Sequence, residues 1–214
     1  MYTPPAYHEG DNALLHQLMW EWSFATIMSH GEGGLLATHL PFLSAPGGAH
    51  GLGTLVSHIA RNNVQWNDLA KSDEVLVIFQ GPHAFISVNW YDNRKTFPTW
   101  NYGAIHAYGT VKLITDPEAI RKILQRTIDT YDTPLGGEWR FEDMPANMTE
   151  PRLRAIIGLE IEITRLEGKL KYNQDKSDAD REGVIATLRQ TPENVPTADF
   201  MERLKQLYLA RNAQ

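Results

Sequence analysis

The chain of 214 residues contains no cysteine. Disulfides, thiol catalysis and thiolate metal ligands are therefore excluded, and the absence fits a reducing compartment. No window approaches the roughly 18 consecutive apolar residues of a membrane-spanning helix. The opening MYTPPAYHEGDNALL also lacks the basic start and apolar run of a secretory signal. We therefore expect a cytoplasmic protein.

The sequence also has no run of basic residues. It contains 20 Lys and Arg and 26 Asp and Glu, for a formal net charge of −6. This negative net charge does not favour non-specific electrostatic binding to nucleic acid. The eight His residues are dispersed, without HExxH or paired spacing, so no metal site is predicted. Haem, which needs only one axial His, stays open. Catalytic motifs of the GxSxG, GxxxxGK[ST] and GxGxxG types are absent.

Hydrophobic residues make up 42% of the chain, which is enough for a core. Short apolar runs separated by turn residues predict strands. The expected strands are 24–29, 35–43, 53–60, 74–80, 84–90, 100–114 and 159–164. Gly81-Pro82 is read as the turn between two of them, and Gly103 and Gly109 indicate bulges or close backbone contacts.

Helices are predicted from apolar spacing and from capping residues. Asp11 or Asn12 begins one, Asp116 with Pro117 begins a second, and Ser177 begins a third with Asp180 completing a capping box. A short helix or loop is expected at 63–71, another short helix around 153–157, and an amphipathic helix at the C-terminus.

Short connections between strands favour antiparallel pairing. The sequence therefore predicts a mainly β fold with flanking helices (α+β), built as one barrel-like core with a helical C-terminal extension. We divide it into a barrel domain at 1–150 and a strand-plus-helices extension at 151–214 that packs on the barrel.

One polar cluster stands at the end of a predicted strand, in VSHIARNN at 56–63. The arginine fork of Arg61, beside Ser57 and Asn62, can hold a phosphate. The other interpretation is that Asn62 or Asn63 caps the following helix and Arg61 is a surface residue. The residue types alone favour this second interpretation.

A second cluster is the aromatic segment FPTWNYGAIHAYG at 97–109. Trp100 and its neighbouring tyrosines offer stacking surfaces for a flat ring, and Asn101 and His106 offer hydrogen bonds to its edge. A packed aromatic strand with satisfied polar groups explains the same residues. Beyond His58 and His106, no residue stands out as a general acid or base, so catalytic residues remain unassigned.

Several segments together resemble the PaiB family, described as negative transcriptional regulators with an FMN-binding split barrel. The matching segments are MYTPPAY at the start, LLATHLPFL at 35–43, SHIARNNVQW at 57–66, VIFQGPHAFIS at 77–87, PTWNYGAIHAYG at 98–109 and GKLKYNQDKSDADREGV at 168–184. The chain departs from the family pattern at Ser57, which replaces Gly, at Val64, which replaces Pro, at 87–91, where the pattern has SPSWY, and at 172–175, which replaces an LSQN-like motif.

The resemblance implies a split barrel, that is, a closed sheet of six or seven strands with flanking helices. It also implies a homodimer that binds FMN near the subunit interface. By analogy, Ser57, Arg61 and Asn62 would take the phosphate, while Trp100, Asn101 and His106 would approach the ring. Strand alternation places His58 opposite Ser57.

The resemblance, together with the residue patterns, leaves three functions open. The first is a PaiB-like transcriptional regulator that binds FMN, for which DNA contact is implied by the resemblance alone. The second is an FMN-dependent oxidoreductase, such as a flavin reductase or small oxidase, in which the cofactor does the chemistry. The third is haem binding or degradation on the same fold.

Overall fold

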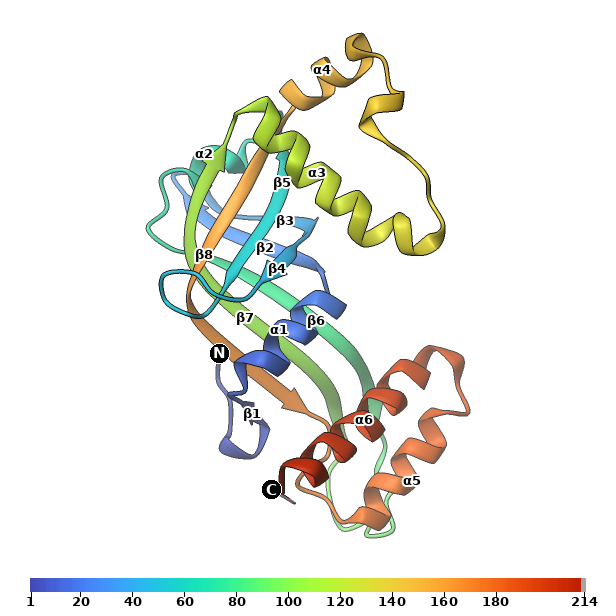
Figure 1. Cartoon of the computed structure of the whole chain (residues 1–214). Helices are drawn as coiled ribbons and strands as arrows, with labels where there is room; N and C mark the ends of the chain where they lie inside the picture. Colours follow the sequence, from blue (N-terminus) through green and yellow to red (C-terminus); the bar gives the residue numbers. More distant parts are fainter. Residues whose placement is uncertain (213–214) are drawn as a thin grey trace. The chain divides into compact units, whose positions relative to one another are not determined.

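The computed structural model describes residues 1–212, which form a mainly antiparallel sheet with flanking helices (Figure 1). This architecture is the one that the sequence predicts. The strands are β1 (His8–Glu9), β2 (Phe24–Gly31), β3 (Gly34–Pro41), β4 (Leu43–Ala45), β5 (Thr54–Ala60), β6 (Val75–Ile86), β7 (Thr99–Ile114) and β8 (Ile156–Lys171). The helices are α1 (Asn12–Glu21), α2 (Gln65–Leu69), α3 (Pro117–Tyr131), α4 (Ala146–Arg154), α5 (Asp178–Leu188) and α6 (Val195–Asn212).

The sheet is an open path rather than a closed ring. Its order among the described residues is β3-β2-β6-β7-β8-β5-β4, and β1 pairs with β8 outside this path. The edge strands β3 and β4 follow one another in the chain, with only Phe42 between them. Phe42 is fully buried, and the hydroxyl of Ser57 on β5 donates to the carbonyl of Pro41 at 2.7 Å. The two edges therefore meet through the covalent chain, and the closed sheet implied by the resemblance is corrected to an open one.

The predicted helix caps are confirmed. The Asp11 carboxylate accepts from the backbone of Ala13 at 2.9 Å, and that of Asp116 accepts from Ala119 at 2.8 Å. Ser177 accepts from the backbone of Asp180 at 3.2 Å. Each of these caps joins residues two or three positions apart, so local sequence is enough to specify it.

The turn predicted at Gly81-Pro82 is wrong, because β6 runs through it without interruption from Val75 to Ile86. Proline removes a ladder donor, and it is tolerated in a strand where one edge is unpaired. The pairing of β6 with β2 covers only Leu76 to Ile78. Pro82 lies beyond that pairing, on the part of β6 whose outer edge has no β2 partner, so the strand can continue.

The described chain divides into two compact units. Unit 1 comprises Met1–Gly10, Gln80–Ile105 and the chain from Glu167 onward, and unit 2 comprises Asp11–Phe79 and His106–Leu166. Strands β6, β7 and β8 each continue from one unit into the other. The division of the sequence at residue 150 stays a prediction.

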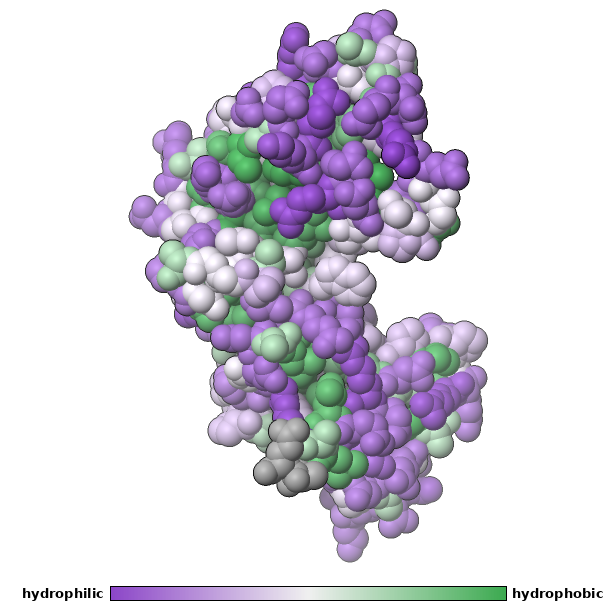
Figure 2. Space-filling model, viewed as in Figure 1, coloured by the Kyte–Doolittle hydropathy of each residue, from purple (hydrophilic) through white to green (hydrophobic). Residues whose placement is uncertain are grey.

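Each unit has its own layer of helices. In unit 1, α5 and α6 lie side by side near the end of the chain (Figure 1). In unit 2, α3 contacts α4 and the strand β5. The space-filling view shows apolar residues gathered over the strands of unit 2, between α2 and α3 (Figure 2). Among residues 1–212, no helix is both long and apolar enough to cross a membrane.

Candidate functional site

Arg61 lies directly after β5, with an exposed side chain in unit 2. Its Nε donates to the carbonyl of Arg154 at 2.8 Å, and its Nη2 donates to that of Ile156 at 3.4 Å. Arg154 is the last residue of α4, so Arg61 satisfies a carbonyl that the end of a helix leaves without an intrahelical partner. The guanidinium has five N–H donors, and Nη1 has no partner among the described residues. Arg61 is thus anchored on one side and can still receive an anion on the other.

The two residues predicted to assist Arg61 differ in exposure. Asn62 is exposed, and its side chain makes no hydrogen bond within residues 1–212. Ser57 is only 3% exposed, and its hydroxyl is engaged with Pro41. The Asn63 side chain accepts from the backbone of Gln65 at 3.0 Å, but the N-cap of α2 is Val64, which makes no side-chain cap bond, so the predicted cap at Asn63 is wrong by one position. His58 is half-buried, and burial lowers the pKa of its imidazole.

Trp100 and Asn101 lie in unit 1 and point to opposite faces of β7, as alternation requires. Trp100 is 53% exposed, with the rings of His83 and Phe85 about it at centroid distances of 6.1 and 6.0 Å. Asn101 is fully buried, and its amide donates to the sulfur of Met201 at 3.4 Å. Its Oδ1 is buried without a hydrogen-bond partner among the described residues. The aromatic surface and the amide therefore face different surroundings.

His83 and Phe85 belong to a groove that the sequence reasoning missed. Together with Trp90 and Trp100 they line a volume of about 740 Å³ in unit 1, bordered by the residues around the start of α6. The sequence contains a signal for this groove: His83 and Phe85 are two positions apart on one strand, so their side chains share a face. The misread turn at 81–82 concealed that shared face.

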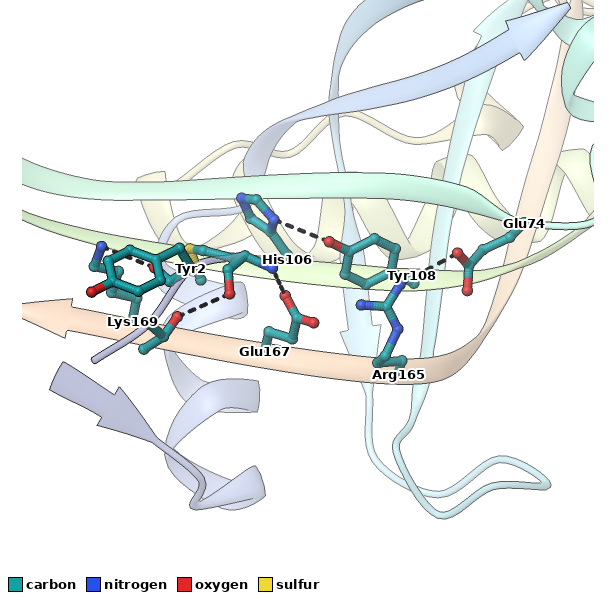
Figure 3. A network of polar contacts seen from close by, with 9 residues as sticks. Tyr2, Glu74, His106, Tyr108, Arg165, Glu167 and Lys169 are labelled. Atoms are coloured by element: carbon teal, nitrogen blue, oxygen red, sulfur yellow. Dashed lines mark hydrogen bonds and ion pairs between the residues drawn. The ribbon is translucent and has the colours of Figure 1, made fainter. Parts of the chain in front are cut away.

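His106 lies in unit 2, next to a cation–ring stack (Figure 3). Its Nδ1 and the hydroxyl of Tyr108 share a hydrogen bond of 3.4 Å. The guanidinium of Arg165 lies 3.4 Å from the centroid of the Tyr108 ring and pairs with Glu74 at 3.4 Å. These contacts orient the imidazole through its own strand and through β8. Its role at the edge of a flavin ring stays a prediction.

In unit 1, another cation–ring contact lies further along β8. The ammonium of Lys169 donates to the carbonyl of Tyr2 at 3.2 Å and lies near the ring of Tyr2 (Figure 3). It also lies near the ring of Tyr102, at 5.2 Å from the centroid. The six predicted residues are therefore shared between the units, with Trp100 and Asn101 in unit 1 and the other four in unit 2. Their assignment to one cofactor site stays a prediction.

Comparison with known proteins adds to this geometry. Residues 1–165 match a family described as "Putative FMN-binding domain". A curated relative, the protease synthase and sporulation protein PAI 2 of Bacillus subtilis, is 31% identical over 204 residues, which covers 94% of this chain and 97% of the relative.

Two solved structures share the fold. The FAD and heme binding protein of Mycobacterium smegmatis has a TM-score of 0.60 at 18% identity, over 81% of this chain and 78% of that one. The flavocytochrome Anf3 of Azotobacter vinelandii has a TM-score of 0.59 at 13% identity, over 82% and 74%. These neighbours confirm the expected split-barrel fold class, with the sheet open in this chain and not closed. On the relative's identity and coverage, and on the match of its first 165 residues, the chain belongs to the PaiB family of proteins with an FMN-binding domain.

Proposed function

We propose that this protein binds FMN and that Arg61 holds the cofactor's phosphate. The observation that carries the proposal is the exposed guanidinium of Arg61, which keeps Nη1 for an anion within the segment that matches the FMN-binding family. Arginine suits this role because its planar fork matches phosphate oxygens and its charge persists at all physiological pH values.

The other predicted residues have narrower roles in this proposal. Asn62 adds an exposed amide beside Arg61, while the buried hydroxyl of Ser57 holds β5 against the end of β3. Trp100 offers an exposed ring face for stacking, and His106 is an oriented imidazole. The unpaired Oδ1 of Asn101 can accept a hydrogen bond. When bound, FMN supplies electron or hydride transfer, and the chain supplies binding and orientation.

Replacing Arg61 is expected to weaken FMN binding. A hydrogen bond to a charged group contributes about 1.5–3 kcal/mol, so Arg61→Ala should lose ~2 kcal/mol, or ~30-fold in affinity. FMN titration followed by absorbance and by flavin fluorescence measures the change. Arg126→Ala, an exposed arginine on α3, is the matched control and should bind like the wild type.

An unchanged affinity in a folded Arg61→Ala variant would remove Arg61 from the site. Circular dichroism of the same samples verifies folding, since Arg61 also donates a hydrogen bond to the last residue of α4.

We also propose that the protein is a homodimer, and the supporting observation is the group of apolar residues over the strands of unit 2 (Figure 2). Sedimentation velocity with and without FMN tests this oligomeric state.

We further propose that the protein acts as a PaiB-like transcriptional regulator in the cytoplasm. The support is the similarity to the protease synthase and sporulation protein PAI 2 of Bacillus subtilis. A net charge of −6 predicts weak direct contact with DNA. Gel-shift titration of candidate promoter fragments at several salt concentrations tests this role, and absence of binding even at low salt would argue against direct repression.

An FMN-dependent oxidoreductase is the second candidate. The observation that favours it is the groove with the exposed Trp100, His83 and Phe85, which offers a flat substrate a stacking surface in unit 1. Oxidation of NADH or NADPH by the FMN-loaded protein, above the rate of free FMN, would support this function over regulation alone.

A further inference from the structure

A second, smaller pocket lies in unit 1, at the end of β8. Its volume is about 210 Å³, which at roughly 30 Å³ per water molecule gives room for about seven water-sized groups. We name it the Lys171 pocket, and its lining residues are Tyr7, Thr96, Phe97, Pro98, Thr99, Lys171, Asn173, Asp175 and Lys176. None of these residues is among those predicted to hold FMN. Four of them come from the C-terminal signature at 168–184, to which no role has been assigned.

Lys171 gives the pocket a cation that makes no direct ion pair among the described residues, although the Asp175 carboxylate of the same pocket attracts it. Its ammonium donates to the hydroxyl of Thr99 and, at 2.7 Å, to the carbonyl of Trp100, both of which are neutral. Among residues 1–212, no carboxylate forms an ion pair with it. Burial lowers its pKa, which shows that the charged form is partly desolvated. An ammonium has three donors, so one N–H remains for a further acceptor.

Asn173 supplies a buried amide with an unmet hydrogen bond. The residue is only 2% exposed and has a backbone φ of 64°, the only positive φ of a residue other than glycine in the described chain. Its Nδ2 donates to the hydroxyl of Tyr91 at 2.6 Å, and its Oδ1 has no partner there. Because a tyrosine hydroxyl can donate or accept, either amide atom can face Tyr91. In both cases the other amide atom remains for a ligand. A buried polar atom without a hydrogen-bond partner lowers the stability of the fold, so such an atom calls for an explanation.

The charges of the pocket favour an anion. Lys176 pairs with Asp175 at 2.7 Å, so these two neutralise each other and Lys171 is left as the excess positive charge. Phe97 and Pro98 supply an apolar wall, and Phe97 is 85% exposed, so the wall is open to solvent. A ligand that matches both features has one anionic end and a small apolar body.

We propose that the Lys171 pocket binds a small organic anion, with its carboxylate or phosphate on Lys171 and the free amide atom of Asn173, and with its apolar body on Phe97 and Pro98. This site shares no side chain with the proposed FMN site, although Lys171 donates to the backbone carbonyl of Trp100, and its argument does not depend on FMN binding. It gives the C-terminal signature a function, namely recognition of a small effector or substrate.

Calorimetric titration of the whole protein with inorganic phosphate, benzoate and the neutral benzamide tests the site. Phosphate or benzoate is expected to bind at one site per chain, and benzamide is not. Binding of one anion and not the other identifies the anionic group. Lys171→Met should weaken binding about tenfold or more, because a hydrogen bond to a charged group is lost. Lys122→Met, which removes an exposed lysine on α3, should leave it unchanged.

Two further variants keep the test valid if Lys171→Met fails to fold. Lys171→Arg keeps the charge and should retain binding, while Asn173→Gly tolerates the positive φ, removes only the amide and should weaken binding. Equal binding of benzoate and benzamide, no binding of either anion, or wild-type affinity in both Lys171→Met and Asn173→Gly would overturn the proposal. FMN affinity is measured on the same variants. Its loss in Lys171→Met would identify the pocket as the cofactor's phosphate site and overturn the assignment of a separate ligand.

Discussion

Phe42→Ala is expected to lower the free energy of unfolding by about 4 kcal/mol, the middle of the range for truncating a buried phenylalanine. Phe42 is 0% exposed and is the single residue between the edge strands β3 and β4 of unit 2. Its ring meets that of Phe79 edge to face at a centroid distance of 6.1 Å. The loss combines removal of apolar surface, a cavity and an aromatic pair.

The position of Phe42 also gives this loss a meaning for the topology of the sheet. Among the described residues, the sheet has no hydrogen-bonded ladder between β3 and β4, so the chain through Phe42 is what joins them. Its backbone N–H donates to the carbonyl of Ser23 at 2.8 Å. Packing of the ring therefore fixes the point at which the two edges meet.

Urea unfolding followed by circular dichroism measures the effect of Phe42→Ala. Phe42→Leu keeps most of the volume and should lose less than half as much. Phe24→Ala removes a phenylalanine of the same unit that is 70% exposed, and should stay within about 0.5 kcal/mol of the wild type. If Phe42→Ala were as stable as Phe24→Ala, the edges would be joined by some contact other than Phe42.

The sequence predicts those parts of the fold that depend on neighbouring residues. The caps at Asp11, Asp116 and Ser177 and the single strand predicted at 100–114 follow from residue types within a few positions. The strand β6 shows the limit of this reasoning. Whether Gly81-Pro82 is a turn or a strand interior depends on which strands lie alongside, and the pairing with β2 ends at Ile78, so Pro82 falls where that edge of β6 is unpaired.

The candidate site shows the same limit more strongly. The sequence identifies Arg61 as a cation at the end of a strand, but its carbonyl partner on Arg154 is 93 positions away. Asn101 is predicted beside Trp100, yet the fold buries one and exposes the other. Lys171 and Asn173 lie within the segment 168–184, but the bond from Lys171 to β7 and the unpartnered Oδ1 of Asn173 exist only in the folded chain. Residue types indicate chemistry, and tertiary contacts decide which groups remain available.

Gly109→Ala is expected to cost about 3 kcal/mol of stability, at the upper end of the range for overpacking a buried site. A Cβ at Gly109 on β7 would lie 2.2 Å from the carbonyl oxygen of Glu162 and 2.8 Å from a methyl carbon of Ile161. The oxygen belongs to the backbone of β8 and cannot rotate away, so the strands themselves must separate. The same close approach was predicted from the glycine in the sequence.

The matched control for Gly109→Ala is Gly33→Ala, in the turn between β2 and β3. A Cβ there meets nothing within 4 Å, and the substitution should be neutral or stabilise by a few tenths of a kcal/mol through the unfolded state. For a chain of this length, a loss of 3 kcal/mol lowers the melting temperature by about 6–12 °C, which differential scanning calorimetry resolves. Equal melting temperatures for the two variants would mean that β7 and β8 are further apart at this point, and that the glycine serves another purpose. A loss of stability in Gly109→Ala alone would instead show that the backbones of β7 and β8 touch at this point. These two strands carry Tyr108 and Arg165, so their close contact limits which side chains the sheet can accept beside His106.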